Sequence, residues 1–182
     1  GSKNPPRMIT LKYNGAGDAP YTAFVGKGIT FDSGGISIKP GDNMGEMKDD
    51  MAGAGAVLGA VKAIAQMKLP CNIIAILSCA ENMPGGNAQR PGDVVKAANG
   101  KTIEVVNTDA EGRMVLADAV WYACEQGAKR VIDIATLTGA VIIALGNETS
   151  GIITNTDELA EAIKAEGKKA VKSHHNVGGL PD

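Results

Sequence analysis

The feature that most constrains the fold is a short apolar run, Asn72–Cys79, near the middle of the chain. A strand with one solvent-exposed face alternates polar and apolar residues, so a near-continuous apolar run of this length predicts a strand buried on both faces. Segments 46–67 and 113–126, rich in small and apolar residues, flank it and each predicts a helix. This order indicates an α/β fold, with a mixed, largely parallel central sheet and helices on both faces.

Residue patterns predict the remaining elements. Residues 8–13 and 21–25 are expected to form strands of a hairpin, and residues 131–135 a buried strand. Asn99-Gly100 between two apolar segments predicts a second hairpin. A loop with an ion pair between Glu81 and Arg90 is expected before it. The last predicted elements are a short helix, a strand and a polar helix, at residues 140–145, 151–154 and 157–169.

Composition excludes several classes of function. The chain has 182 residues, 44% of them hydrophobic, and a formal net charge of −2 without a long charged run. This balance suits one domain with a sizeable core and argues against binding to nucleic acid or to a membrane surface. The three cysteines lie in apolar segments, which indicates free thiols in a reducing compartment, and we expect a cytoplasmic protein without a membrane span.

Two glycine-containing segments carry charged residues. Residues 26–41 hold five glycines, which favour a long connection with close backbone approach, although no Walker sequence is present. In Val106–Arg113, Asp109, Glu111 and Arg113 occupy alternate positions and would face one spot in an extended segment. Clustered carboxylates are ligands for divalent cations. The alternative is a helix N-terminus whose acids complement the dipole.

Loops that follow strands could bring these charges together at one rim of the sheet. Only one of the neighbours Asp49 and Asp50 can face a given site from a helix. Lys27 would, from the sequence alone, be interpreted as a substrate-binding lysine. The acids that could balance the charge of two divalent cations are Asp32, Asp50, Asp109 and Glu111.

Several of these segments together resemble the leucyl aminopeptidases, the cytosol aminopeptidase family of two-metal exopeptidases. The resemblance runs from about Asn4 to about Lys169 and is carried by five motifs: Val25–Gly35, Met47–Met51, Glu81–Pro84, Arg90–Asp93 and Asn107–Arg113. It implies a three-layer sandwich like that of the zinc exopeptidases. It also implies a hydrolase that removes the N-terminal residue, leucine or similar, from peptides through a metal-bridging water or hydroxide.

The resemblance assigns roles to individual residues. Asp32 and Glu111 would be shared by both ions, and Asp109 would belong to the more exchangeable site. Lys39 would stabilise the oxygen of the tetrahedral intermediate, and Arg113 would hold a bicarbonate ion. The matched metal ligands are Lys27, Asp32, Asp50, Asp109 and Glu111. The residues matching the first side-chain pocket are Met47, Thr136 and Gly139.

The resemblance also implies two divalent metal ions, zinc or manganese with magnesium or cobalt as alternatives, and a homohexamer acting on peptides with a free N-terminus. Residues 1–182 would be part of a C-terminal catalytic domain, without the family's N-terminal domain, and residues 170–182 depart from the family pattern. The alternative is an inactive, truncated domain that still binds metal or assembles.

Overall fold

The structure is a computed structural model that describes residues 1–177, with side chains through residue 170. Its residues form two compact units, Gly1–Leu137 and a second unit that begins at Thr138. The predicted departure from the family pattern at residues 170–182 falls partly on residues 178–182, which lie outside the described residues.

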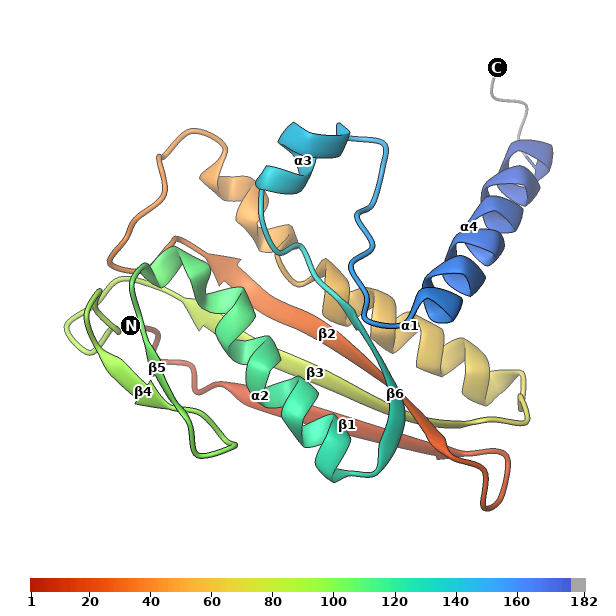
Figure 1. Cartoon of the computed structure of the whole chain (residues 1–182). Helices are drawn as coiled ribbons and strands as arrows, with labels where there is room; N and C mark the ends of the chain where they lie inside the picture. The colour runs from red at the N-terminus through yellow and green to blue at the C-terminus, as the bar shows by residue number, and fades with distance from the viewer. Residues whose placement is uncertain (178–182) are drawn as a thin grey trace. The chain divides into compact units, whose positions relative to one another are not determined.

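The first unit contains a mixed sheet with strand order β1-β3-β2-β6 (Figure 1). The strands are β1 (Arg7–Asn14), β2 (Tyr21–Asp32), β3 (Asn72–Asn82) and β6 (Ala128–Ile134). β2 is parallel to both β3 and β6, whereas β1 is antiparallel to β3. The largely parallel sheet is therefore confirmed. The predicted hairpin of the first two strands is wrong, because β3 lies between them.

The residues of β3 alternate between two cores. Ile74 and Ile76 pack with α2 (Glu111–Glu125) on one face of the sheet. Ile73, Ala75 and Leu77 pack with α1 (Ala52–Gln66) on the other face. Figure 1 shows the two helices on opposite faces of the sheet. This arrangement confirms the three-layer sandwich and explains why the residues from Ile73 to Leu77 are all apolar.

The helix predicted at residues 46–67 is divided in two. A 3₁₀ helix, η1 (Met44–Asp49), precedes α1, and Asp50 lies in the turn between them. The small residues of α1 allow the helix to lie against the sheet: a Cβ on Gly26 of β2 would be 2.5 Å from the Cα of Ala54. This contact also explains why β2 continues through residues that we expected to be a loop, since these glycines serve helix packing.

β6 is half-exposed, although we predicted a buried strand. Every residue of β6 is at an intermediate or exposed position, and Ile134 is 39% exposed. Within the described residues β6 pairs on one side only, with β2. An edge strand with one pairing partner has a larger exposed surface than the central β3, and this explains the difference.

The second hairpin is confirmed, with β4 (Val94–Lys96) antiparallel to β5 (Thr102–Glu104) and Gly100 at a φ of +84° in its turn. The segment that follows is not extended as expected. Residues Thr108–Ala110 form a 3₁₀ helix, η2, and α2 begins directly at Glu111. The helix-terminus interpretation of Asp109 and Glu111 therefore describes the backbone correctly.

The second unit contains the short helix α3 (Ala140–Leu145) and the long polar helix α4 (Asp157–Val177). The strand expected at residues 151–154 is absent from the described residues of this unit. A strand needs a partner strand for its backbone hydrogen bonds, and none of the described segments after residue 137 supplies one. In the described part of the chain, no helix combines the length and apolar character of a membrane crossing.

Candidate metal centre

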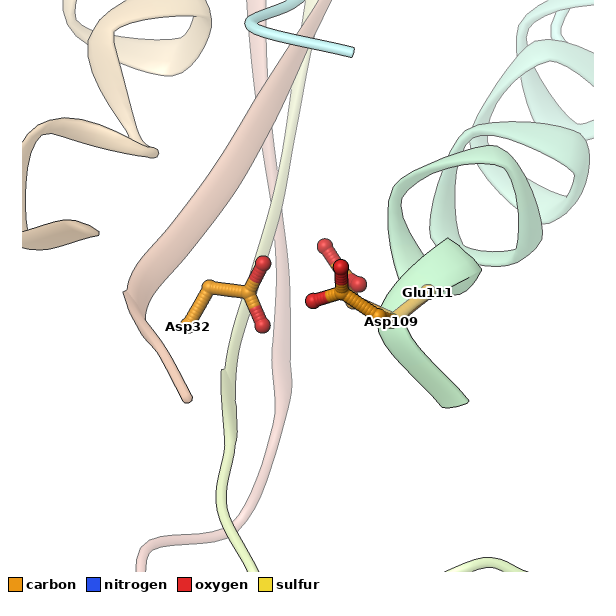
Figure 2. Close-up of side chains that lie close together, drawn as sticks. All are labelled: Asp32, Asp109 and Glu111. Atoms are coloured by element: carbon orange, nitrogen blue, oxygen red, sulfur yellow. The ribbon is translucent and has the colours of Figure 1, made fainter. Parts of the chain in front are cut away.

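Three carboxylates meet where the carboxyl end of β2 approaches the start of α2. Asp32 is the last residue of β2, Asp109 lies in η2 and Glu111 is the first residue of α2. One carboxylate oxygen from each lies within 4.8 Å of the others. Figure 2 shows the three side chains pointing toward one another across the space between the strand end and the helix. Such a group of oxygen ligands could hold a divalent cation.

Local hydrogen bonds hold these segments in place. The side chain of Asn107 accepts a hydrogen bond from the Asp109 amide at 2.8 Å and so caps η2. Thr108 Oγ1 donates to the Gly34 carbonyl at 2.6 Å and accepts from the Ser37 amide at 2.8 Å. Gly34 has a φ of +86°, a conformation that favours glycine, and it turns the chain away after β2.

Lys27 links one further acid, Asp50, to this group. Its side chain is 3% exposed, and Nζ donates to Asp50 Oδ1 at 2.8 Å and to the Thr136 carbonyl at 2.9 Å. The same nitrogen lies 3.2 Å from Glu111 Oε1. Gly112 makes room for this chain, because a Cβ there would be 2.7 Å from Lys27 Cε. The buried ammonium therefore bridges two carboxylates from different elements.

Asp50 carries the clearest sign of an incomplete coordination environment. The residue is 6% exposed, and its Oδ1 accepts hydrogen bonds from Lys27 and, at 2.6 Å, from Thr136 Oγ1. Its buried Oδ2 has no hydrogen-bond partner among the described residues. A buried carboxylate oxygen without a partner is costly, so the donor set fits a cation at this position.

Lys39 bridges the other pair of acids. Its Nζ lies 3.1 Å from Asp32 Oδ2 and 2.7 Å from Asp109 Oδ1, and its side chain is 22% exposed. Burial is the largest single effect and lowers the pKa of Lys39. The combined hydrogen bonds and charges of Asp109 and Asp32 outweigh it and raise that pKa on balance. Lys39 is therefore a charged group at the open side of the cluster.

The cluster as a whole keeps an excess of negative charge. Burial raises the pKa of Glu111, and the charge of Asp32 adds to this effect, while Lys27 opposes it. Two ammonium groups offset only part of the charge of four carboxylates: Asp32, Asp50, Asp109 and Glu111. Divalent cations would remove this imbalance.

The other predicted residues are less closely tied to the cluster. Arg113 is exposed on the first turn of α2, and Met47 is half-buried in η1. Gly139 belongs to the second unit, so its pocket role stays a prediction. Asp49 is exposed, which leaves Asp50 as the one of the pair that faces the site. Thr136 contacts Asp50 and Lys27 through its hydroxyl and carbonyl groups.

The expected Glu81–Arg90 ion pair is wrong. Arg90 pairs with Asp93 at 3.0 Å, and Glu81 accepts hydrogen bonds from Ser2 and Asn4 instead. The neighbouring Asn82, to which we assigned no individual role, is the residue that contacts the cluster. The side-chain amide of Asn82 carries no charge, so its place at the end of the central strand was the one feature of the sequence that could have indicated its role.

Comparison with known proteins agrees with this geometry. The sequence pattern of a family described as "Cytosol aminopeptidase family, catalytic domain" matches residues 1–177 of this chain. A probable cytosol aminopeptidase of Pseudomonas fluorescens is 57% identical over 172 residues, which cover 93% of this chain and 34% of that protein. One of Rickettsia bellii is 54% identical with the same coverages. The chain thus spans about a third of the length of these relatives.

A solved structure shows the same fold. The bottromycin maturation enzyme BotP in complex with Mn is 45% identical, with a TM-score of 0.87, and the match covers 93% of this chain and 38% of BotP. The structural match over 93% of this chain, together with the family match over residues 1–177, establishes that this chain belongs to the cytosol aminopeptidase family.

Proposed function

We propose that this chain is part of the catalytic domain of a metal-dependent aminopeptidase that hydrolyses the N-terminal residue from peptides. The observation that carries the proposal is the convergence of Asp32, Asp109 and Glu111 from separate elements on one spot. Lys27 links Asp50 to this group, and the buried Oδ2 of Asp50 has no hydrogen-bond partner among the described residues. Family membership supports the reaction class, and the manganese complex of BotP supports a metal requirement.

We assign the two divalent cations to the acids and to Lys27. Glu111 belongs to the pair of acids bridged by Lys27 and Asp32 to the pair bridged by Lys39, and these two acids would be shared by both ions. Asp50 and Lys27 would complete one site, and Asp109 the other. Such ions polarise a carbonyl oxygen and lower the pKa of a bound water. Because an ammonium has no lone pair, Lys27 must release a proton before its nitrogen can bind a cation.

Two further cationic residues would act on the substrate. Lys39 sits at the open side of the cluster and would stabilise the negative charge that develops on the carbonyl oxygen during attack. Arg113, exposed on the first turn of α2, would hold the bicarbonate ion implied by the family resemblance. The family resemblance assigns Met47, Thr136 and Gly139 to the pocket for the first side chain of the peptide, leucine or similar.

The remaining properties are proposals at the level of the whole protein. Manganese or zinc is the expected metal pair, and the expected assembly is a homohexamer in the cytoplasm. Light scattering of the chain at several concentrations would test the assembly, because a hexamer would give six times the mass of one 18.6 kDa chain.

The proposal is tested by counting bound metal and by measuring hydrolysis of leucyl-p-nitroanilide in the same preparation. We expect turnover with manganese or zinc and none after chelation. Asp50→Asn should lower the metal content, whereas Asp49→Asn, its exposed neighbour, should leave it unchanged. Turnover that survives complete chelation would reject the mechanism, and equal metal content in the two variants would reject the assignment of Asp50.

A second candidate function is a domain without turnover that still binds metal or assembles. The observation in its favour is the exposure of large apolar side chains in the second unit: Ile143 is 90% exposed and Ile153 102% exposed. Surfaces of this kind usually contact other protein. Two bound metals without hydrolysis in the assay above would favour this candidate over the first.

A further inference from the structure

We propose that Asn82 is the positioning residue of the metal centre, which fixes Asp32 and Glu111 so that one oxygen of each carboxylate faces the cations. The inference rests on the proposed function, because it assigns a task toward ions that Asp32 and Glu111 would share. Asn82 itself would not touch the metal or the substrate.

Asn82 joins the elements that carry the acids. It ends β3 and stands in register with Asp32 at the end of β2. Its Nδ2 donates to Asp32 Oδ1 at 2.8 Å and to the Thr108 carbonyl at 2.9 Å, and lies 3.3 Å from Glu111 Oε2. One amide group thus connects β2, η2 and the first residue of α2. All three neighbours are acceptors, which identifies the atom as the amide nitrogen.

These bonds decide which oxygens are free. Asp32 Oδ1 also accepts from the Gly34 amide at 2.9 Å, so this oxygen is occupied by two donors. Asp32 Oδ2 is left facing the cluster, 3.1 Å from Lys39 Nζ. Glu111 is divided in the same way, with Oε2 toward Asn82 and Oε1 toward Lys27. Hydrogen bonds of this kind orient carboxylate ligands in metal sites.

Asn82 is itself held rigidly enough for this task. Its carbonyl oxygen accepts hydrogen bonds from the Ser33 amide at 2.9 Å and from Ser33 Oγ at 2.7 Å. Its side-chain Oδ1 lies against Gly35, where a Cβ would be only 2.7 Å away. Gly35 has a φ of +70°, so this close approach suits glycine. The backbone of Asn82 is therefore held by Ser33 and its side-chain oxygen is held against Gly35 before any cation binds.

The chemistry requires an amide at this position. Aspartate has the same shape, but an ionised carboxylate can only accept hydrogen bonds and would face two other carboxylates and a carbonyl. Alanine would leave Asp32 with the Gly34 amide as its remaining donor on Oδ1. Both changes release the acids from their fixed orientation without removing any proposed metal ligand.

Asn72, at the opposite end of the same strand, offers a matched control. It is 2% exposed, and its Nδ2 donates to the Gly17 and Ala19 carbonyls at 2.8 and 2.7 Å. Like Asn82, it is an asparagine that ties β3 to neighbouring backbone. Because these partners lie in the turn before β2, the Asn72→Ala variant measures the effect of losing a structural hydrogen-bond link without changing the metal centre.

The experiment measures Mn²⁺ affinity of the full chain by isothermal titration calorimetry and by the electron paramagnetic resonance signal of free Mn²⁺. We expect Asn82→Ala and Asn82→Ser to weaken Mn²⁺ binding by about 10- to 100-fold. Asn72→Ala should lower the melting temperature and leave Mn²⁺ affinity within about twofold of wild type. The visible spectrum of Co²⁺ bound to each variant reports whether the coordination geometry has changed.

The outcomes separate the inference from the proposed function. If the wild-type chain binds no Mn²⁺, the proposed function fails, and the role of Asn82 fails with it. If wild type binds Mn²⁺ and either folded Asn82 variant binds with the same affinity and the same Co²⁺ spectrum, only the role of Asn82 is overturned. Equal losses of affinity in the Asn72 and Asn82 variants would show a purely structural role and would also overturn it.

Discussion

Gly112→Ala tests how tightly the fold holds Lys27. Gly112 is the second residue of α2, and an added Cβ would lie 2.7 Å from Lys27 Cε, 3.0 Å from Nζ and 3.1 Å from Cδ. Packed carbon atoms are normally about 3.5–4.0 Å apart. The end of the lysine chain would therefore have to move by roughly 1 Å.

Lys27 has little freedom to make this movement. Its side chain is 3% exposed, and its nitrogen is held by Asp50 and by the Thr136 carbonyl. Forcing an extra carbon into a packed site typically costs about 1–3 kcal/mol. Alanine in place of glycine gains about 0.5–1 kcal/mol in a helix. We expect the cost to exceed the gain, so that the free energy of unfolding decreases.

Gly59→Ala supplies the control for helix propensity. Gly59 lies in α1, is exposed and has no atom within 4 Å of an added Cβ. This variant should gain about 0.5–1 kcal/mol of stability. The two glycine-to-alanine variants should consequently differ in their free energy of unfolding by about 1–3 kcal/mol.

Urea unfolding of both variants measures this difference, and titration with Mn²⁺ measures its effect on the site. We expect Gly112→Ala to bind Mn²⁺ more weakly and Gly59→Ala to bind it as wild type does. The reasoning is refuted if Gly112→Ala is stabilised as much as Gly59→Ala and keeps wild-type affinity for Mn²⁺. That result would mean that Lys27 moves aside without loss.

Three further predictions follow from the charges of the site. Lys39→Ala should keep both metals, as counted by elemental analysis, and slow hydrolysis by about 10²–10³-fold; an unchanged rate would mean that its role is misassigned. Asp109→Asn should bind one metal fewer than wild type, and full metal content would contradict its assignment. The pKa of Glu111 is raised above its usual value of 4.5, so in metal-free protein this group destabilises the fold increasingly as pH rises through that folded pKa. Relative to Glu111→Gln, metal-free wild type should lose stability in urea unfolding as the pH rises above the usual pKa of 4.5, until it has passed the raised pKa, and a difference that does not change with pH would contradict this.

The central layer of the fold was predictable because one physical requirement dominates it. A strand packed on both faces must be apolar at nearly every position, and residues 72–79, in which only Asn72 and Ser78 are polar, meet this requirement. The length of β2 was not predictable in the same way. Its glycines suggested a loop, whereas Gly26 serves the approach of Ala54 in α1. Local preference alone gives no information on a helix that arrives later in the chain.

Strand pairing shows the same limit. Two neighbouring strands joined by a turn usually form a hairpin, and the sequence of β1 and β2 contains nothing that forbids one. The pairing is decided by β3, which is apolar on both faces and takes the position between them. The pairing that buries the apolar faces of β3 is favoured over the hairpin with the shorter connection. Comparing these two pairings requires the three-dimensional structure.

The site shows why the residue types and their geometry are separate inferences. Asp109 and Glu111 were expected to face one spot as alternate residues of an extended strand. In the structure Asp109 belongs to η2 and Glu111 to α2. In a regular α-helix, side chains two residues apart point in different directions, so helical geometry alone would separate these two carboxylates. They nevertheless converge, because the change from a 3₁₀ helix to an α-helix falls between them and because Asn82 Nδ2 contacts Glu111 Oε2 at 3.3 Å. The chemistry could thus be deduced from the acids alone, whereas their arrangement depends on a neutral amide from another strand. If Asn82 can be replaced without effect on Mn²⁺ binding, the helix junction alone must be sufficient to bring the two carboxylates together.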